Sequence, residues 1–408
     1  MSKSRFVILG GGMVAGYAAK EMAEHGLKSG ELTIVSADDA LPYERPPLSK
    51  GFLAGKDNET GILINSGDWY REHGVTVALK TTVQSVDLAK KSLRTSSSQT
   101  FEFDNLLIAT GARARKLNVA GADLGNVFYL RSIADSRAIR TAADRAKRAV
   151  VIGGGFIGME VASVLAQKNI QTTMAFPEER VWKRMFTPEM SRFFENYYAA
   201  RNVEILAKSN VTGFEGKGNV SAVALEGGRT IPCDMVVVGA GAEPVMDLFA
   251  GSAVAGRDGV EVNEYLETAA AGVFAAGDIA NYPDKIFEKR RRVEHWDNAV
   301  SQGQHWARLV TGDRQPFVHV PYFFSDVFDL SYEFWGDTDG ATQTVVRGDL
   351  NSTSFSVWWL KQNHLVAAFL MNRPDDERQA PEWIQVKKAV SADRLGDQKK
   401  PASETIQS

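Results

Sequence analysis

A short pattern that occurs twice constrains the fold of this chain more than any other feature of its sequence. Residues 6–19 read FVILGGGMVAGYAA, and residues 150–162 read VVIGGGFIGMEVA. Each copy is an apolar run rich in β-branched residues, then three glycines, then small and apolar residues at helical spacing. This order predicts a strand, a tight turn and a closely packed helix. Because the N-terminus of such a helix attracts phosphate groups, the two copies predict two dinucleotide-binding units.

The two copies match the G-x-G-x-x-G pattern to different degrees. Gly153, Gly155 and Gly158 match it completely, whereas the first copy has the permitted alanine, Ala15, at the third position. Two incidental glycine turns are the alternative interpretation. The recurrence of strand, glycines and helix in the same register favours the dinucleotide interpretation.

The bulk composition excludes several classes of protein. A chain of 408 residues with 44% hydrophobic and 24% charged residues is typical of a globular protein of two or three domains. Its net charge of −3 provides no field that would attract nucleic acid or an anionic membrane. The first predicted strand begins by Phe6 and no apolar run is long enough to span a bilayer. We therefore expect no signal peptide, no membrane insertion and a cytoplasmic location.

Cysteine and histidine usage argues against disulfide and metal chemistry. The chain has one cysteine, Cys233, so neither a disulfide framework nor a catalytic cysteine pair can form within it. Cys233 lies in the lead-in to the predicted strand DMVVVGAGAEP and is expected to be a small core residue. The histidines His25, His73, His305 and His364 show no ligand spacing, so no metal site is predicted.

The pattern along the chain divides it into several segments. Strand-like runs such as ELTIVS, FEF, DNLLIATGAR, DMVVVGAGAEP and VFAAGDIA belong to the two dinucleotide units. The proline-rich LPYERPPLSKGFL is too rigid and irregular for a helix interior. The later part alternates aromatic-rich strands such as SFSVWWL and LVAAFLM, and the end, GDQKKPASETIQS, has little to bury. The predicted division is a first dinucleotide domain (1–115 and 244–315), a second (116–243), a C-terminal α+β domain (316–390) and a disordered tail (391–408).

Five separated motifs connect this sequence to a known group of proteins. They are PYERPPLSK (residues 42–50), LLIATG, VFAAGD, RRVEHWDNA (291–299) and PYFFSDVFDL (321–330). In this order they resemble the FAD-dependent pyridine nucleotide–disulfide reductase superfamily. Within it they are similar to monodehydroascorbate reductases, the ferredoxin reductases of bacterial oxygenase systems and apoptosis-inducing-factor-like proteins. The resemblance implies an α/β fold like that of glutathione reductase, with two Rossmann-like domains and a C-terminal α+β domain.

The resemblance also implies which residues bind FAD in the first domain. The pyrophosphate would face the first glycine turn, the adenosine ribose would bond to the acid that ends the second strand, and the remaining residues would lie along the adenine, ribityl chain and flavin. The set is Gly10, Gly11, Gly12, Met13, Asp38, Arg45, Lys50, Val83, Arg131, Asp278, Trp296 and Phe324.

The second domain would bind the nicotinamide nucleotide. The implied set is Gly153, Gly154, Gly155, Phe156, Ile157, Gly158, Met159, Glu178, Arg184, Gly241, Glu294 and His295. Glu178 would accept a hydrogen bond from the 2′-hydroxyl of the adenosine ribose, and its carboxylate would repel a 2′-phosphate. We therefore expect NADH, with NADPH as the alternative because Arg180, Lys183 and Arg184 are close in the sequence.

The implied reaction is hydride transfer from the nicotinamide to the flavin, with the protein positioning the two rings. Lys50 and Glu160 would form an ion pair near the flavin, and Glu294 and His295 would flank the nicotinamide. These four are the expected catalytic residues. Simpler interpretations are that Glu294 is a solvated surface acid and that Glu160 lies on the exposed face of its helix.

Two further segments each allow more than one interpretation of their role. The basic run at residues 289–292 is either a solvated face or a docking surface for an acidic electron carrier or a cofactor phosphate. The aromatic-rich residues 322–359 are expected to be mostly core, although Phe324 would cover the flavin.

Two positions depart from the monodehydroascorbate reductase pattern. Those enzymes carry an arginine at each, which helps to hold the anionic ascorbyl radical, whereas this chain has Val300 and Asp326. At an effective dielectric constant near 20, one misplaced charge is worth about 1–3 kcal/mol. Stretches such as AFPEERVWKRMFTPEM nevertheless resemble the monodehydroascorbate reductase branch.

The prediction is therefore an FAD-dependent NAD(P)H oxidoreductase. It would take a hydride from NADH and pass electrons singly to an acceptor, which we expect to be a ferredoxin-type iron–sulfur protein. The alternatives are a monodehydroascorbate reductase with an altered anion site, whose acceptor is a small organic radical, and a slow redox sensor like apoptosis-inducing factor. The sequence leaves the oligomeric state open, a homodimer included.

Overall fold

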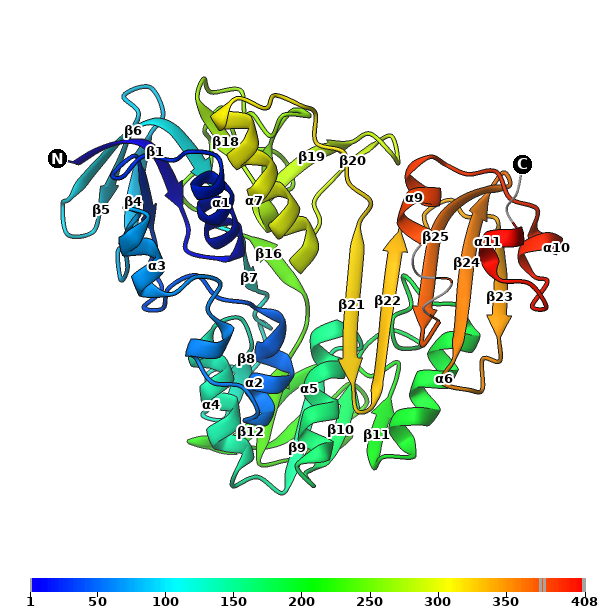
Figure 1. The fold of residues 1–408 in the computed structure, drawn as a ribbon. Coiled ribbons are helices and arrows are strands. Elements are labelled where there is room, and N and C mark those ends of the chain that lie inside the picture. The colour runs from blue at the N-terminus through cyan, green and yellow to red at the C-terminus, as the bar shows by residue number, and fades with distance from the viewer. Residues whose placement is uncertain (1, 374–375, 377–378, 406–408) are drawn as a thin grey trace. The chain divides into compact units, whose positions relative to one another are not determined.

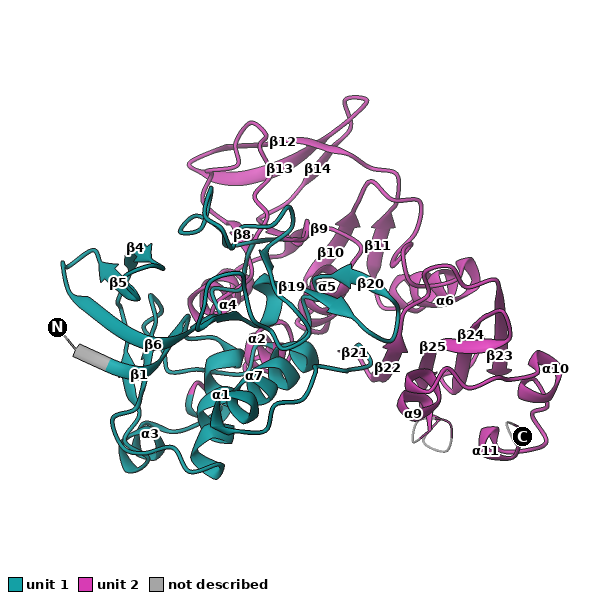
Figure 2. Cartoon of the chain, turned by 90° about the horizontal axis from the view of Figure 1, so that it is seen from above, with its two compact units in different colours: residues 1–45, 60–113, 243–321 teal, residues 46–59, 114–242, 322–408 magenta. Residues whose placement is uncertain are grey.

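The computed structural model describes residues 2–373, 376 and 379–405. Its chain divides into two compact units, which Figure 2 shows in teal and magenta. Unit 1 consists of residues 1–45, 60–113 and 243–321, and unit 2 of residues 46–59, 114–242 and 322–408. The sequence did not indicate that residues 46–59 join unit 2. The domain boundaries given above stay predictions.

Unit 1 is built on a seven-stranded sheet with the order β3–β2–β1–β6–β5–β4, in which β18 also pairs with β6. Its strands are β1 (Ser2–Leu9), β2 (Leu32–Val35), β3 (Thr76–Ala78), β4 (Val83–Asp87), β5 (Ser92–Thr95), β6 (Thr100–Ile108) and β18 (Val273–Ala275). All pairs are parallel except those that join β4 to β5 and β5 to β6. FEF and DNLLI, expected as two strands, form the single strand β6 because β1 pairs along both.

Two long helices cover this sheet side by side (Figure 1): α1 (Met13–Glu24) and α7 (Trp296–Thr311). They approach closely because Gly303 has no side chain, and a Cβ there would lie 2.7 Å from the carbonyl oxygen of Val14. Glu21 of α1 is buried and pairs with Arg308 of α7 at 2.8 Å. The other elements of unit 1 are η2 (Thr60–Ile62), α3 (Gly67–Glu72), η3 (Gly277–Ile279) and the sheet β17 (Val260–Glu261), β19 (Ala280–Asp284) and β20 (Lys289–Arg291).

Unit 2 repeats the same arrangement in a five-stranded parallel sheet with the order β11–β10–β9–β15–β8. Its elements are β8 (Val127–Tyr129), α4 (Ile133–Ala143), β9 (Arg148–Ile152), α5 (Phe156–Gln167), β10 (Gln171–Ala175), α6 (Pro188–Ala199), β11 (Val203–Leu206) and β15 (Met235–Val238). In unit 1 the strand before the glycine turn, β1, lies between β2 and β6, and in unit 2 the corresponding strand, β9, lies between β10 and β15. This placement is typical of Rossmann folds. The two Rossmann-like units predicted from the duplicated pattern are confirmed.

The proline-rich segment contributes two short helices to unit 2, η1 (Pro46–Ser49) and α2 (Gly51–Ala54). This differs from the irregular structure expected there. Proline lacks an N–H group, and the first turn of a helix does not need it, so helical structure can begin at Pro46. An antiparallel sheet of β12 (Val211–Lys217), β13 (Asn219–Leu225) and β14 (Thr230–Pro232) completes this part, and β7 (Ala112–Ala114) pairs with β16 (Ala242–Pro244).

The C-terminal part of unit 2 is a five-stranded antiparallel sheet with the order β21–β22–β25–β24–β23. Its elements are β21 (Tyr322–Val327), β22 (Leu330–Gly336), β23 (Gln343–Gly348), β24 (Phe355–Lys361), β25 (His364–Met371), α9 (Ala380–Gln385), α10 (Ala392–Leu395) and α11 (Ala402–Thr405). The strands predicted at SFSVWWL and LVAAFLM are confirmed as β24 and β25. Every residue of β24 except Lys361 is buried, so this strand is covered on both faces.

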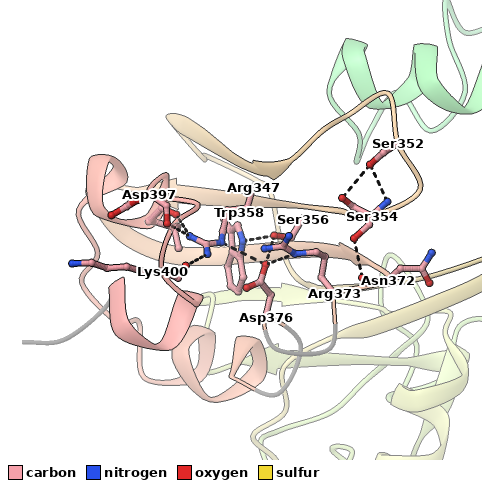
Figure 3. Close-up of polar contacts among 11 residues, drawn as sticks. Arg347, Ser352, Ser354, Ser356, Trp358, Asn372, Arg373, Asp376, Asp397 and Lys400 are labelled. Atoms are coloured by element: carbon pink, nitrogen blue, oxygen red, sulfur yellow. Dashed lines mark hydrogen bonds and ion pairs between the residues drawn. The ribbon is translucent and has the colours of Figure 1, made fainter.

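A buried arginine organises the end of the chain (Figure 3). Arg347 of β23 is 1% exposed and donates to the backbone carbonyls of Leu395, Asp397 and Lys400. Its Nε lies 3.5 Å from Asp376, which is also buried. The disorder expected for residues 391–408 does not hold for residues 391–405, because these contacts and the burial of Leu395 fix them; residues 406–408 lie outside the described part.

Two further findings bear on the sequence predictions. Cys233 is 1% exposed in the apolar core of unit 2, where burial raises its pKa to about 12, so it is a core residue as expected. Within the described residues, no helix is long and apolar enough to cross a membrane. The same residues hold no cluster of three or more histidine, cysteine or acidic side chains arranged to bind a metal.

Candidate functional site

The glycine turn of unit 1 leaves room for a phosphate group. Gly10 has φ +122°, and a Cβ there would lie 2.2 Å from the carbonyl oxygen of Ala109, so only glycine fits. Gly12 is the N-cap of α1, and among the residues that the structure describes no side chain caps the free N–H groups of its first turn. A Cβ at Gly12 would meet only the guanidinium of Arg45, at 3.7 Å. An uncapped helix N-terminus beside an arginine fits an anionic pyrophosphate.

The glycine turn of unit 2 has the same geometry. Gly153 has φ +116° and lies against the backbone of Gly239, where a Cβ would be 2.3 Å from the carbonyl oxygen. Gly155 is the N-cap of α5, and in the described part of the chain no side chain caps this helix start and no atom lies within 4 Å of a Cβ added at Gly155. Gly158 packs on the turn itself, because a Cβ added at this position would lie 2.1 Å from the carbonyl oxygen of Gly153. The turn therefore fits a second pyrophosphate.

The residues beside both turns differ in packing and exposure. Gly11 packs on Ser36 and Gly154 on the ring of Phe176, so both approach the next strand closely. Met13 and Met159 are buried at the helix starts, Phe156 packs 5.9 Å from the indole of Trp182, and Ile157 is 39% exposed.

Asp38 lies just past the end of β2, at the position expected to hold a ribose hydroxyl. Its carboxylate accepts hydrogen bonds from the Tyr43 hydroxyl at 3.0 Å and from the backbone N–H of Asp39 at 2.8 Å. A carboxylate has about four acceptor positions, so Asp38 is oriented by the protein and still able to bind a ligand hydroxyl.

Sequence reasoning missed Glu44, which organises the region around Trp296. The carboxylate of Glu44 accepts from the indole Nε1 of Trp296 at 2.5 Å and from the hydroxyl of Tyr17. Burial, together with Glu44, raises the pKa of the Tyr17 hydroxyl, so this group keeps its proton and donates. Glu44 stands inside the PYERPPLSK motif, which was the available signal.

Glu294 and His295 lie at the start of α7. The Glu294 carboxylate pairs with Arg292 and its side chain is 31% exposed, so it is neither buried nor free in solvent. His295 is the N-cap of α7 and keeps part of its surface exposed. Removal from water nevertheless lowers the pKa of its ring to about 3, so the imidazole is neutral at pH 7.

The remaining residues of the expected FAD set fall in both units. Val83 is buried at the start of β4, and Asp278 lies in η3, whose first N–H donates to Gln302 at 2.7 Å. Arg131 immediately precedes the Ser132 capping box of α4, and its backbone N–H donates to Asp135.

Lys50 and Glu160 form the ion pair that the resemblance implied. The Lys50 ammonium lies 2.7 Å from Glu160, whose side chain is 4% exposed. The interpretation of Glu160 as an exposed helix residue is therefore wrong. The ammonium also lies 5.2 Å from the centroid of the Phe324 ring. Two serines, Ser49 and Ser325, hydrogen-bond the same carboxylate and were not predicted.

Glu178 and Arg184 are both exposed on the segment after β10. Within the described part of the chain, neither side chain bonds to another residue. By contrast, Glu179 pairs with Arg180 at 2.5 Å and with Lys183 at 3.6 Å. Gly241 has φ +92° in an open loop after β15.

The basic run at residues 289–292 is largely committed to internal contacts. Arg291 pairs with the buried Asp284 at 3.0 Å, and Arg292 pairs with Asp258 at 2.9 Å. Arg290 donates to the backbone carbonyl of Val262 at 2.6 Å. These contacts argue against both alternatives given above, a freely solvated face and a docking surface.

The two positions that depart from the monodehydroascorbate reductase pattern differ in exposure. Val300 lies on α7 and is 8% exposed. Asp326 lies on β21, where its side chain is exposed and flanked by the buried Ser325 and Val327.

Two protein families match the chain. The pyridine nucleotide-disulphide oxidoreductase family matches residues 4–303, and the reductase C-terminal family matches residues 322–405. Among curated proteins, a peroxisomal monodehydroascorbate reductase of Arabidopsis thaliana is 39% identical over 95% of this chain and 83% of its own length. The monodehydroascorbate reductase of Solanum lycopersicum is 36% identical over 97% of each chain.

The solved structures that match the chain have names that differ from those of these two curated relatives. The covalent putidaredoxin reductase–putidaredoxin complex matches with a TM-score of 0.94 and 29% identity, over 99% of this chain and 98% of that one. The ferredoxin reductase for the CYP199A2 system from Rhodopseudomonas palustris also matches with a TM-score of 0.94, at 28% identity over 100% of both chains. Family, relatives and fold agree that this chain belongs to the pyridine nucleotide-disulphide oxidoreductase family and is an NAD(P)H-dependent flavoprotein oxidoreductase.

Proposed function

We propose that this protein takes a hydride from NADH and delivers electrons singly to a small iron–sulfur protein of the ferredoxin type. The observation that carries the choice of acceptor is the exposed carboxylate of Asp326, where monodehydroascorbate reductases carry an arginine. The other parts of the proposal follow from the two glycine turns and the residues around them.

FAD is proposed to bind to unit 1 through its glycine turn, with Arg45 beside the pyrophosphate and Asp38 on the adenosine ribose. Val83, Arg131, Asp278, Trp296 and Phe324 are proposed to line the rest of the cofactor. Bound FAD supplies the capacity to accept a hydride and to release the two electrons one at a time. Lys50 is proposed to contact the flavin, and Glu160 to hold the Lys50 ammonium.

The nicotinamide nucleotide is proposed to bind to the glycine turn of unit 2. The open space at Gly155 supports a pyrophosphate there. Glu294 and the neutral imidazole of His295 are proposed to orient the nicotinamide. The exposed carboxylate of Glu178 supports NADH, because a 2′-phosphate beside it would be repelled.

The charge around Asp326 and Val300 supports a ferredoxin-type acceptor over a small organic anion. An anionic radical would gain no positive charge from these positions and would meet one negative charge. At an effective dielectric constant near 20, this costs about 1–3 kcal/mol for each charge, or about one to two decades of affinity. The ferredoxin reductases with matching folds support the same choice.

A second candidate is monodehydroascorbate reductase activity. The observation that favours it is sequence identity, since the relatives at 36–39% identity carry that name. In this case, other cations of the chain would have to replace the two missing arginines.

The test compares acceptors for NADH oxidation by the FAD-loaded protein. Enzymatically generated ascorbyl radical and a small ferredoxin are supplied in turn, at equal flavin concentration. We expect fast turnover with the ferredoxin and turnover at least tenfold slower with the radical. Fast turnover with the radical alone would overturn the choice of acceptor and establish the second candidate.

A charge-reversal variant sharpens the comparison. Asp326→Arg should raise kcat/KM for the ascorbyl radical by at least about thirtyfold, because it removes one negative charge and adds one positive charge, each worth about 1–3 kcal/mol. Glu382→Arg is the matched control, since it makes the same change at an exposed acid of α9. Equal effects of the two variants would show that only net charge matters.

A further inference from the structure

One buried carboxylate joins three segments of unit 2 that lie far apart in the sequence. Glu160 comes from the second turn of α5, Ser49 and Lys50 from the end of η1, and Ser325 from β21. The hydroxyl of Ser325 donates to Oε1 of Glu160 at 2.7 Å, and Lys50 Nζ lies 2.7 Å from the same oxygen. The hydroxyl of Ser49 donates to Oε2.

Both serines are as deeply buried as the acid that they contact. Ser325 is 0% exposed, Ser49 2% and Glu160 4%. A carboxylate removed from water needs donors at both oxygens, and a single ammonium cannot supply them. The two hydroxyls therefore share with Lys50 the task of stabilising the negative charge.

This sharing determines how strongly Glu160 neutralises the Lys50 ammonium. With three donors, the negative charge is spread over three hydrogen bonds, and the ammonium keeps more of its positive field. With the serines removed, Lys50 would be the main donor and would be held more tightly by Glu160. The ammonium has a second contact, the face of Phe324, which limits how far it can move.

We propose that Ser49 and Ser325 are positioning residues that act through Glu160 on Lys50, and thereby set the reduction potential of the bound flavin. This inference rests on the proposed function, since Lys50 acts on the flavin only where FAD binds as proposed. A positive charge beside the flavin favours its reduced, electron-rich form. Weakening that charge should therefore lower the potential.

A purely structural role for these hydroxyls would give a different result, and the chain offers a matched control. Ser163 lies one turn further along α5 and is 1% exposed. Its hydroxyl accepts from the backbone N–H of Phe328 at 2.7 Å, so it also ties α5 to the loop after β21. Ser163→Ala removes such a tie without touching Glu160.

The experiment measures the midpoint potential of bound FAD in the full-length holoprotein, by equilibration with a reference dye. Ser49→Ala and Ser325→Ala should each lower the equilibrium constant for two-electron reduction about tenfold, which corresponds to about 30 mV. Ser163→Ala should leave the potential unchanged, and Ser325→Thr, which keeps the hydroxyl, should restore it. The rate constant of flavin reduction by NADH should fall with the potential.

The outcomes separate this inference from the proposed function. A wild-type holoprotein that NADH reduces, together with serine-to-alanine variants of unchanged potential, would overturn the inference alone. A chain that binds no FAD, or whose flavin NADH does not reduce, would overturn both. Equal shifts in the Ser163 and Ser325 variants would indicate general loosening of α5 and would also overturn it. If Ser325→Ala fails to fold, Ser49→Ala decides the question alone.

Discussion

At the scale of single residues, Glu178 provides the sharpest test of nucleotide choice. Glu178→Gln removes an exposed carboxylate that no described residue neutralises, so it removes the repulsion against a 2′-phosphate. We expect kcat/KM for NADPH to rise about fivefold and that for NADH to fall a few-fold, since one exposed charge is worth about 1 kcal/mol. Steady-state kinetics with both nucleotides measure the change.

Glu189→Gln is the control for this prediction, because Glu189 is an exposed acid on α6 of the same unit. It should leave the NADPH-to-NADH ratio unchanged. A ratio that Glu178→Gln does not alter would mean that the ribose is held elsewhere.

Residue-scale prediction from sequence succeeded where a motif fixed the position. Lys50 and Glu160 were assigned to one another through the resemblance, and the ion pair is present. Ser49 and Ser325 were not assigned, because their bonds to Glu160 join positions 111 and 165 residues apart. A hydroxyl carries no sequence pattern that names such a distant partner.

At the scale of elements, Arg347 is expected to hold the C-terminal helices α10 and α11 in place. Arg347→Met would remove the donors to three backbone carbonyls of this segment and one partner of the buried Asp376. Breaking a buried charge pair costs about 3–5 kcal/mol. We expect limited proteolysis within residues 391–405 to become at least tenfold faster.

Arg373→Met is the matched control for the C-terminal segment. Arg373 also pairs with Asp376, at 3.1 Å, but its side chain is 27% exposed and bonds none of the three carbonyls (Figure 3). Equal cleavage of the two variants would show that the loss of a partner for Asp376, and not the contacts to the carbonyls, exposes the segment.

Elements were predictable where their signal was local. The turns after β1 and β9 were predicted because positive φ and close packing require glycine at fixed positions. The single strand β6 was divided because Asp104 and Asn105 interrupt its apolar pattern, although β1 pairs with Asn105. The order of residues 391–405 was missed because it depends on Arg347, which lies in another strand.

At the scale of the whole molecule, the sequence predicted two similar units but not how the chain is divided between them. The order β3–β2–β1–β6 recurs as β11–β10–β9–β15, which follows from the duplicated strand–turn–helix pattern. Residues 46–59 belong to unit 2, and the chain returns to unit 1 at residue 60. The proline pair at residues 46–47 indicates a rigid segment but not a change of unit. Membership of a unit depends on tertiary contacts, and a local pattern does not record them.

The free energy of unfolding is a property of the whole molecule, and we expect two histidines to contribute to its dependence on pH. Burial lowers the pKa of His295 to about 3 and also lowers that of His305, while a histidine in the unfolded chain titrates near about 6.5. Below about pH 6.5 the unfolded chain therefore binds protons that the native protein does not, so the free energy of unfolding falls as the pH falls. For the partly exposed His295 we expect a loss of about 1 kcal/mol between pH 7 and pH 5. Denaturant unfolding of the FAD-saturated protein at both pH values measures this loss.

The His295→Asn variant should lose less stability than the wild type over this range, whereas a variant at an exposed histidine, His364→Asn, should lose as much as the wild type. An equal loss in all three proteins would show that His295 takes up its proton in the folded state as readily as in the unfolded chain.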